Sequence, residues 1–192
     1  MSPLPALGFK SFAPAYSLEG NYYSLATVTV PSGGASTITF AGVPSGYKHL
    51  QIRGLGRSTN STSTTSYSAE LLMQFNGDTG SNYKAHAIEA VGSGTPGTQS
   101  QSTLTIVNLG GPFSTQTANV FGGSIIDILD YASTTKNKTV RAIGGQDMNG
   151  YGQMMFASGL WMNSSSAITS ISLSSGGTGW AQYSQFALYG VK

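Results

Sequence analysis

The side chains that could carry catalysis or bind a metal are few and widely spaced. His49 and His86 are the two histidines, and each falls on a different predicted strand. A histidine-based metal site needs a third ligand nearby, and no HxH, HxxxH or HExxH spacing occurs. The sequence contains no cysteine, which excludes thiolate chemistry and disulfide bonds. We therefore predict no metal site and no cofactor, with both histidines facing solvent.

The sequence gives little support for nucleophilic or acid-base catalysis. The nearest pattern to a G-x-S-x-G nucleophile turn is Gly92-Ser93-Gly94, which lies in a predicted loop between strands. Asp127 and Asp147 are the notable acids because both fall in the most apolar part of the chain. Asp127 shares a predicted strand face with Ile125, which predicts a buried carboxylate paired with Arg141 on the following strand. A structural ion pair is favoured over a glycosidase carboxylate pair, so no enzyme is predicted.

Two further patterns leave alternatives open. The segment Asn76–Asn82, NGDTGSN, resembles an oxygen-rich calcium loop, although tight calcium sites use several carboxylates and this one offers Asp78 alone. Turn chemistry explains the same residues equally well. Tyr151, Trp180 and Tyr183 lie at or beside predicted turns, where their rings could stack on sugars. Packing in the core or in a subunit interface is the commoner fate of such residues.

The element that positions most of these residues is the stretch Asn119–Met162, the densest apolar material in the chain. It reads as three strands, and Asn149-Gly150 predicts a two-residue hairpin between the second and third. The third strand, Gly152–Met162, alternates with two apolar faces. One face holds Met155, Ala157, Gly159 and Trp161, and the other holds Met154, Phe156, Ser158, Leu160 and Met162. A strand with two apolar faces is expected at the centre of a sheet.

Short alternating segments bounded by Gly- and Pro-rich turns recur at intervals of roughly 8–12 residues. No segment shows the i, i+3, i+4, i+7 spacing of an amphipathic helix. We predict an all-β fold, an antiparallel β-sandwich of the jelly-roll kind with about ten or eleven strands. The predicted organisation is an N-terminal arm, residues 1–22, followed by a single β-sandwich domain, residues 23–192.

Charge is sparse. Charged residues make up 8% of the chain, against roughly 25% in typical soluble domains. Since surface charge keeps soluble monomers apart, this composition predicts a protein packed against copies of itself or a partner. The Lys and Arg residues are scattered without a run, so no nucleic-acid binding is expected. No apolar run approaches the ~20 residues of a membrane-spanning helix.

The N-terminal arm is rich in proline and apolar side chains. Its large apolar residues include Leu4, Leu7, Phe9, Phe12 and Tyr16. They are too apolar for a free tail, so the arm either lies on the domain or reaches a neighbouring subunit or an anchoring surface. The arm lacks the basic leader and apolar run of a secretory signal, which predicts synthesis in a cytoplasm.

Several phrases carry a family resemblance. They are TVTVPSGGASTITFAGVPSGYKHLQIRGLGRS, FNGDTGSNY, IDILDYASTTKNKTVRAIGG, SGLWMNSSSAITSISL and QFALYGVK. Together, over Ala26 to Lys192, they resemble a family of tailed-bacteriophage virion proteins. The resemblance implies a jelly-roll module of the kind found as capsid cement or decoration proteins, head fibres and tail-fibre tips, usually trimeric.

Two functions follow from the resemblance. The first is a capsid cement protein, a homotrimer in the virion whose arm and polar loops bind the major capsid protein and neighbouring subunits. Binding only the assembled shell would stabilise it by mass action. The alternative is a fibre tip that contacts host surface glycans through Trp180, Tyr183 and loops such as Ser58–Ser66. The cement role is expected first, because the chain has neither a long shaft nor a heptad repeat.

Overall fold

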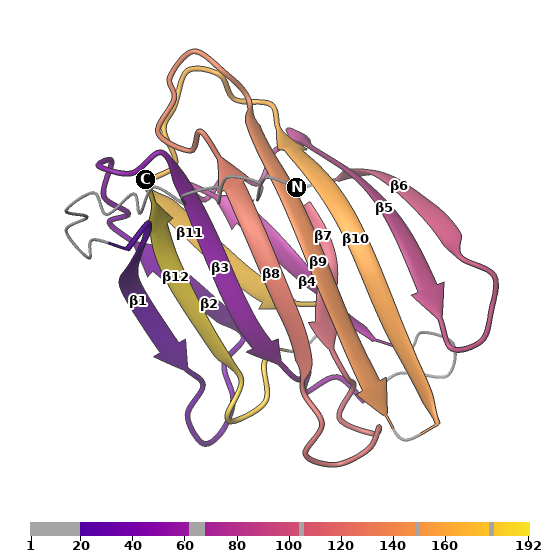
Figure 1. Cartoon of the computed structure of the whole chain (residues 1–192). Helices are drawn as coiled ribbons and strands as arrows, with labels where there is room; N and C mark the ends of the chain where they lie inside the picture. The colour runs from indigo at the N-terminus through magenta and orange to yellow at the C-terminus, as the bar shows by residue number, and fades with distance from the viewer. Residues whose placement is uncertain (1–19, 62–67, 104–105, 149, 177–178) are drawn as a thin grey trace, which may run out of the picture.

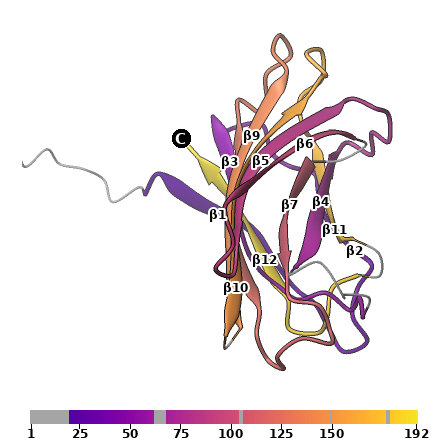
Figure 2. The same ribbon diagram turned by 90° about the vertical axis from the view of Figure 1, so that its right-hand side faces the viewer.

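The computed structural model describes residues 20–61, 68–103, 106–148, 150–176 and 179–192. Its regular structure is entirely β, and twelve strands form two antiparallel sheets that stack face to face (Figures 1 and 2). No helix occurs in these described ranges. The predicted all-β antiparallel sandwich is confirmed.

The large sheet has eight strands in the order β1-β12-β3-β8-β9-β10-β5-β6. They are β1 (Tyr22–Thr29), β3 (His49–Gly56), β5 (Tyr83–Val91), β6 (Gly97–Thr103), β8 (Gly122–Leu129), β9 (Lys138–Met148), β10 (Tyr151–Trp161) and β12 (Gln185–Val191). The small sheet has the order β2-β11-β4-β7. Its strands are β2 (Thr37–Ala41), β4 (Ala69–Phe75), β7 (Ile106–Gly111) and β11 (Ser170–Ser175).

The connectivity is that of a jelly roll with two insertions. Without β5, β6, β9 and β10, eight strands remain, and the first pairs with the last, the second with the seventh, and so on inward. These nested pairs are β1·β12, β2·β11, β3·β8 and β4·β7. Such nested pairing across two sheets defines the jelly roll. The four inserted strands extend the large sheet beyond β8, on the side where Figure 1 shows β10, β5 and β6.

The strand count exceeds the predicted ten or eleven because of the segment around β6. The predicted loop at Gly92-Ser93-Gly94 continues into a polar segment that shows no apolar alternation. In the structure its backbone pairs with β5 from Gly97 onward, with Thr98 opposite Ile88. A polar edge strand of this kind is held by backbone hydrogen bonds to its neighbour and buries no alternating apolar side chains. The pattern of apolar residues in the sequence therefore could not predict it.

The core lies between the two sheets and is rich in aromatic side chains. Phe75, Tyr83 and Trp161 are fully buried, with the Phe75 and Trp161 ring centroids 5.6 Å apart. The strand β10 lies between β9 and β5, as predicted for a two-faced apolar strand. Its face carrying Met155 and Trp161 points into this core.

The predicted two-residue hairpin joins β9 to β10. Met148 pairs with Tyr151, and Gly150 has a φ of 123°, in the region that favours glycine. Asn149, the other predicted turn residue, lies outside the described residues. The hairpin fixes the register of β10 and therefore decides which of its side chains point outward.

Candidate interaction surface

The two outward faces of the sandwich differ in chemistry. Three strands of the small sheet, β2, β4 and β11, present mainly hydroxyl, amide and carboxylate groups, with Leu72 and Ala41 as the apolar residues on the same face. The polar residues are Thr37, Thr39, Glu70, Gln74, Ser170, Ser172 and Ser174. The large sheet presents large apolar side chains instead, several of them about half exposed. This outer face of the large sheet is turned toward the viewer in Figure 1 and to the left in Figure 2. An exposed contiguous apolar patch marks an interaction site more often than scattered apolar residues do.

Four apolar residues form a continuous line across this face. Ile125 on β8 is opposite Ile143 on β9, Ile143 is opposite Phe156 on β10, and Phe156 is opposite Ile88 on β5. Phe156 is 57% exposed and Ile88 is 58% exposed. We call these four residues the apolar row. Directly opposed side chains in adjacent strands are close neighbours, so the row is one connected surface.

A groove runs beside the apolar row. Gly123 on β8 is opposite Gly145 on β9, while Leu55 flanks Gly123 and Met154 flanks Gly145. The two glycines lack side chains, which leaves a depression between Leu55 and Met154 with a volume of 550 Å³. Ile125 and Ile143 of the apolar row, together with Arg53 and Tyr189, are also among its lining residues. We call this hollow the glycine groove.

On the other side of the apolar row lies a line of polar contacts. Arg141 Nε donates to Asp127 Oδ2 at 3.0 Å, and Gln51 Nε2 donates to Asp127 Oδ1 at 2.8 Å. The predicted pairing of Asp127 with Arg141 is confirmed. Its predicted burial in the core is corrected, because Asp127 and Ile125 face outward. Asp147 lies six residues beyond Arg141 on β9, roughly 20 Å along the strand, so the two acids do not form a carboxylate pair.

The two histidines are far apart in the sheet. His86 is exposed on β5, where its Nε2 lies 3.2 Å from Ser100 Oγ. His49 is on β3, and β8, β9 and β10 separate the two strands. Among the described residues, no three His, Cys, Asp or Glu side chains are grouped as metal ligands.

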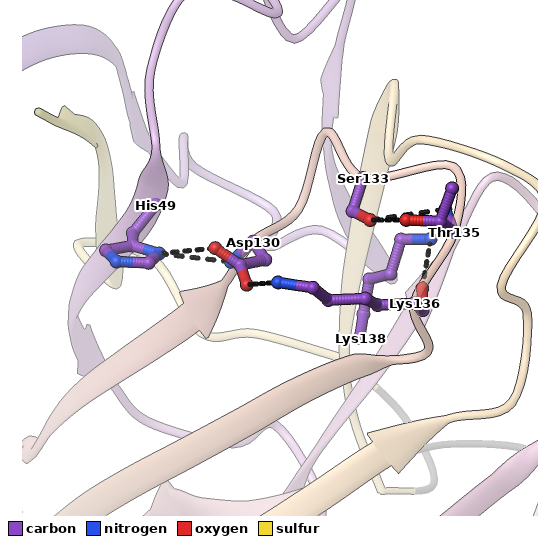
Figure 3. A network of polar contacts seen from close by, with 6 residues as sticks. All are labelled: His49, Asp130, Ser133, Thr135, Lys136 and Lys138. Carbon is purple, nitrogen blue, oxygen red and sulfur yellow. Dashed lines mark hydrogen bonds and ion pairs between the residues drawn. The ribbon is translucent and has the colours of Figure 1, made fainter.

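His49 belongs to a polar network at the end of β8 (Figure 3). The backbone N–H of Asp130 donates to His49 Nδ1 at 3.0 Å. Nδ1 therefore acts as an acceptor, so the neutral ring carries its proton on Nε2. A triad histidine needs the opposite tautomer, with Nδ1–H donating to the carboxylate. The Ser133 hydroxyl in the same view contacts Thr135 Oγ1 at 3.4 Å instead of the histidine.

The remaining contacts of this network stabilise the connection between β8 and β9. Lys136 Nζ lies 2.8 Å from Asp130 Oδ2, and this hydrogen bond and charge lower the pKa of the Asp130 carboxyl. Lys138 is fully buried and donates to the backbone oxygens of Lys136 and Asn163, both at 2.9 Å. Burial lowers the pKa of the Lys138 ammonium. These contacts make the network in Figure 3 part of the folded connection between β8 and β9.

The segment that resembled a calcium loop is organised by hydrogen bonds to Asp78. Its carboxylate accepts from the Gly80 N–H at 2.9 Å, from Asn82 Nδ2 at 2.9 and 3.1 Å, and from Trp161 Nε1 at 2.7 Å. The Trp161 and Asn82 bonds lower the pKa of Asp78. Asn76 and Gly77 both have positive φ, as a type I′ turn requires. N–H groups already occupy the oxygens a cation would need, so the turn interpretation is favoured.

Tyr83 links this turn to the core and gives a pH prediction. Its hydroxyl accepts from the Phe75 N–H and donates to the Asp78 carbonyl, both at 3.1 Å. Burial raises the pKa of Tyr83 to about 12, while an unfolded tyrosine titrates near pH 10. Above pH 10 the unfolded chain loses this proton first, so stability falls as the pH rises toward 12.

The expected loss from Tyr83 is about 1.4 kcal/mol at pH 11 and about 2.7 kcal/mol once both states are ionised. Urea unfolding at pH 8 and pH 11 measures it. The Tyr83→Phe variant removes the titrating group, so its stability should fall less between the two pH values. An equal fall in both proteins would show that Tyr83 ionisation does not contribute.

The predicted contact aromatics have different fates. Trp180 is 0% exposed, its Nε1 donates to the Leu173 carbonyl at 3.1 Å, and its ring centroid is 4.7 Å from that of Phe186. Trp180 therefore packs in the core, one of the commoner fates expected for it, and does not present its ring to a glycan or a second subunit. Tyr183 is 69% exposed, at a φ of 72°, and keeps its predicted accessibility. Tyr151 begins β10, and its side chain lies outside the described residues.

Other predicted contacts are only partly described. The arm residues Leu4, Leu7, Phe9, Phe12 and Tyr16 lie outside the described residues, as does most of the polar segment Ser58–Ser66. Ser58 itself is buried, and its Oγ accepts from Ser175 Oγ at 2.7 Å. The start of that segment is therefore fixed to the end of β11 and is not a free contact loop.

Sequence reasoning missed the apolar row and the glycine groove. Alternation in β10 separated Phe156 from Trp161 but did not say which face points inward. The sequence did contain one indication of this surface. Successive predicted strands carry apolar residues on both faces, with Ile125, Ile143 and Phe156 among them. Strand order, which only the structure gives, brings these residues together with Ile88.

Comparison with known proteins adds no relative: no family model, no curated protein and no solved structure matches the chain. Within the described residues, no helix is long and apolar enough to cross a membrane.

Proposed function

We propose that the chain is a structural protein of a tailed-phage virion, a capsid cement or decoration protein that binds the assembled shell and stabilises it. The observation that carries the proposal is the contrast between the two outer faces. A hydroxyl-rich small sheet suits solvent, while the large sheet presents the apolar row and the glycine groove. The jelly-roll topology and the 8% charged composition support the same role.

The mechanism is burial of the large sheet's outer face against other subunits. Each Å² of apolar surface removed from water contributes roughly 25 cal/mol, and sparse charge keeps the desolvation cost low. The chain associates as a homo-oligomer, a trimer, made in the host cytoplasm and bound to the major capsid protein. Because the protein binds the assembled shell and not its free subunits, mass action shifts the equilibrium toward the closed capsid.

Cryo-electron microscopy of purified virions tests the proposal. The expected result is density for this fold over the capsid shell at quasi-equivalent positions, with the large sheet facing neighbouring subunits. Density confined to the tail or to fibre ends would refute the cement role. Density over the shell with the small sheet inward would keep the role and refute the assignment of the contact face.

A receptor-binding role is the second candidate, supported by Tyr183 and by a second hollow on the outer face. Phe156, Ile88 and His86 line this 310 Å³ hollow together with Ala87, Thr98 and Ser158. Exposed rings beside hydroxyl and imidazole groups suit the apolar and polar faces of a sugar. Tail-end density, together with weaker host adsorption for Tyr183→Ala, would favour this role.

A further inference from the structure

We propose that the glycine groove is the docking site for the apolar N-terminal arm, residues 1–19, of the same chain. The proposal assigns the glycine groove to the chain's own arm and leaves the exposed Phe156 and Ile88 of the apolar row for contact with other subunits. It therefore reduces the contact surface of the proposed function without resting on that function. It rests on the shape of the groove, on the composition of the arm, and on the place where the described chain begins.

The groove has room for large apolar side chains. A Cβ placed on Gly123 would meet no atom within 4 Å, so the floor is open backbone. Leu55 and Met154 rise on either side and are 53% and 60% exposed. An apolar hollow of 550 Å³ is the size class that binds drug-sized ligands. Several leucine or phenylalanine side chains would fill it.

The arm has the matching chemistry. The large apolar side chains of residues 1–19 include Leu4, Leu7, Phe9, Phe12 and Tyr16, and Lys10 and Glu19 are the charged residues. A segment this apolar gains by covering exposed apolar surface. Its three prolines restrict the backbone and reduce the entropy lost on docking.

The described chain enters the large sheet beside Arg53, a residue at the rim of the groove. Tyr22 opens β1 in the same sheet and lies on the same outer face. The Arg53 guanidinium lies 5.3 Å from the Tyr22 ring and 5.1 Å from the Tyr189 ring. Arg53 and Tyr189 also line the groove. Tyr22, near the start of the described chain, therefore contacts a residue of the groove rim.

The arm is long enough to reach. From β1 to β8 is three strand spacings, roughly 15 Å, and the row of Gly123 lies roughly 23 Å along β1 from Tyr22. The direct path is therefore on the order of 27 Å, while the residues between Phe9 and Gly20 span up to about 36 Å when extended. The extended arm is therefore long enough for Phe9 to reach the groove, and the excess length allows a turn in the backbone. Tethering gives an effective concentration on the order of millimolar, which favours the chain's own arm over that of a neighbouring copy.

Photo-crosslinking of the full chain tests the docking. Phe9→p-benzoylphenylalanine places a photoreactive ring in the arm, and mass spectrometry locates the residues that it captures. The expected result is capture at Leu55, Ile125 or Met154, in a product with the mass of one chain. Capture elsewhere on the sandwich, capture in a product of two chains, or no capture would each overturn the proposal.

A groove-filling variant gives the second test. Gly123→Leu in the same photoreactive chain fills the floor without a clash and should lower the yield of groove products about tenfold. Gly46→Leu is the matched control, since a Cβ there also meets nothing within 4 Å and Gly46 does not line the groove. An unchanged yield in Gly123→Leu, or an equal fall in Gly46→Leu, would overturn the proposal. Virion imaging tests the cement role separately, so each idea can fail without the other.

Discussion

Replacing Phe156 by aspartate is expected to abolish self-association of the chain while leaving the sandwich folded. Phe156 is at the centre of the outer face, with Ile143 on one side and Ile88 on the other. Its outward exposure means that the folded monomer does not need its apolar contacts. In an assembled contact the same ring would be desolvated, and aromatic residues at the centre of an interface commonly contribute about 2 kcal/mol or more.

A carboxylate at position 156 would also have to be buried without a partner. We therefore expect the dissociation constant of the oligomer to rise at least about 100-fold, which corresponds to about 2.7 kcal/mol. Sedimentation velocity over a micromolar concentration series measures this change. Equal thermal unfolding of the two proteins at a concentration where both are monomeric would confirm that the fold is intact.

Ser158→Asp is the matched control. Ser158 is exposed on the same strand and face, two residues from Phe156 and opposite Arg141 and His86. It therefore receives the same new charge beside basic side chains instead of apolar ones. The prediction fails if Ser158→Asp weakens association as much as Phe156→Asp does. It also fails if the unmodified chain is monomeric across the concentration series.

The sequence determined strand faces well because alternation is a local property. Met155, Ala157 and Trp161 were predicted to share a face of one strand, and all three are buried in the core. The alternation also allowed this strand, β10, to be placed, with its boundaries shifted by one residue. Local patterns state which side chains lie together on one strand but not which neighbouring strand they meet.

The errors arose where distant segments decide the environment. Trp180 follows a glycine-rich turn, which predicted exposure, yet backbone bridges to Ala35 and Ser58 hold it inside the sandwich. Ile125 and Asp127 were placed in the core region because their strand is apolar on both faces. The small sheet covers only one of those faces, and no local signal identifies which one. The existence of an interaction surface could therefore be predicted, because strands are apolar on both faces and charge is sparse. The residues that form the surface could not.

Arg57→Met is expected to cause the largest loss of stability from a single polar side chain. Arg57 follows β3 and is 8% exposed. Its Nη1 donates to the carbonyls of Thr117 and Val120 at 2.7 and 2.9 Å, and its Nη2 donates to those of Ser114 and Gln116 at 3.2 and 2.9 Å. One guanidinium thus holds the whole connection between β7 and β8.

The expected decrease in the free energy of unfolding is about 3–5 kcal/mol, because hydrogen bonds to charged groups contribute roughly 1.5–3 kcal/mol each and do not add fully. Guanidinium chloride unfolding, followed by the fluorescence of the buried Trp161 and Trp180, measures it. Arg53→Met is the control, since Arg53 lies on the outer face over Tyr22 and Tyr189 and should cost about 1 kcal/mol or less. The loss of unfolding free energy in Arg57→Lys should lie between those of Arg53→Met and Arg57→Met. A compact ammonium cannot reach four carbonyl groups that are arranged around a planar guanidinium. Equal losses in Arg57→Met and Arg53→Met would mean that the connection is held by its own turns and not by the guanidinium.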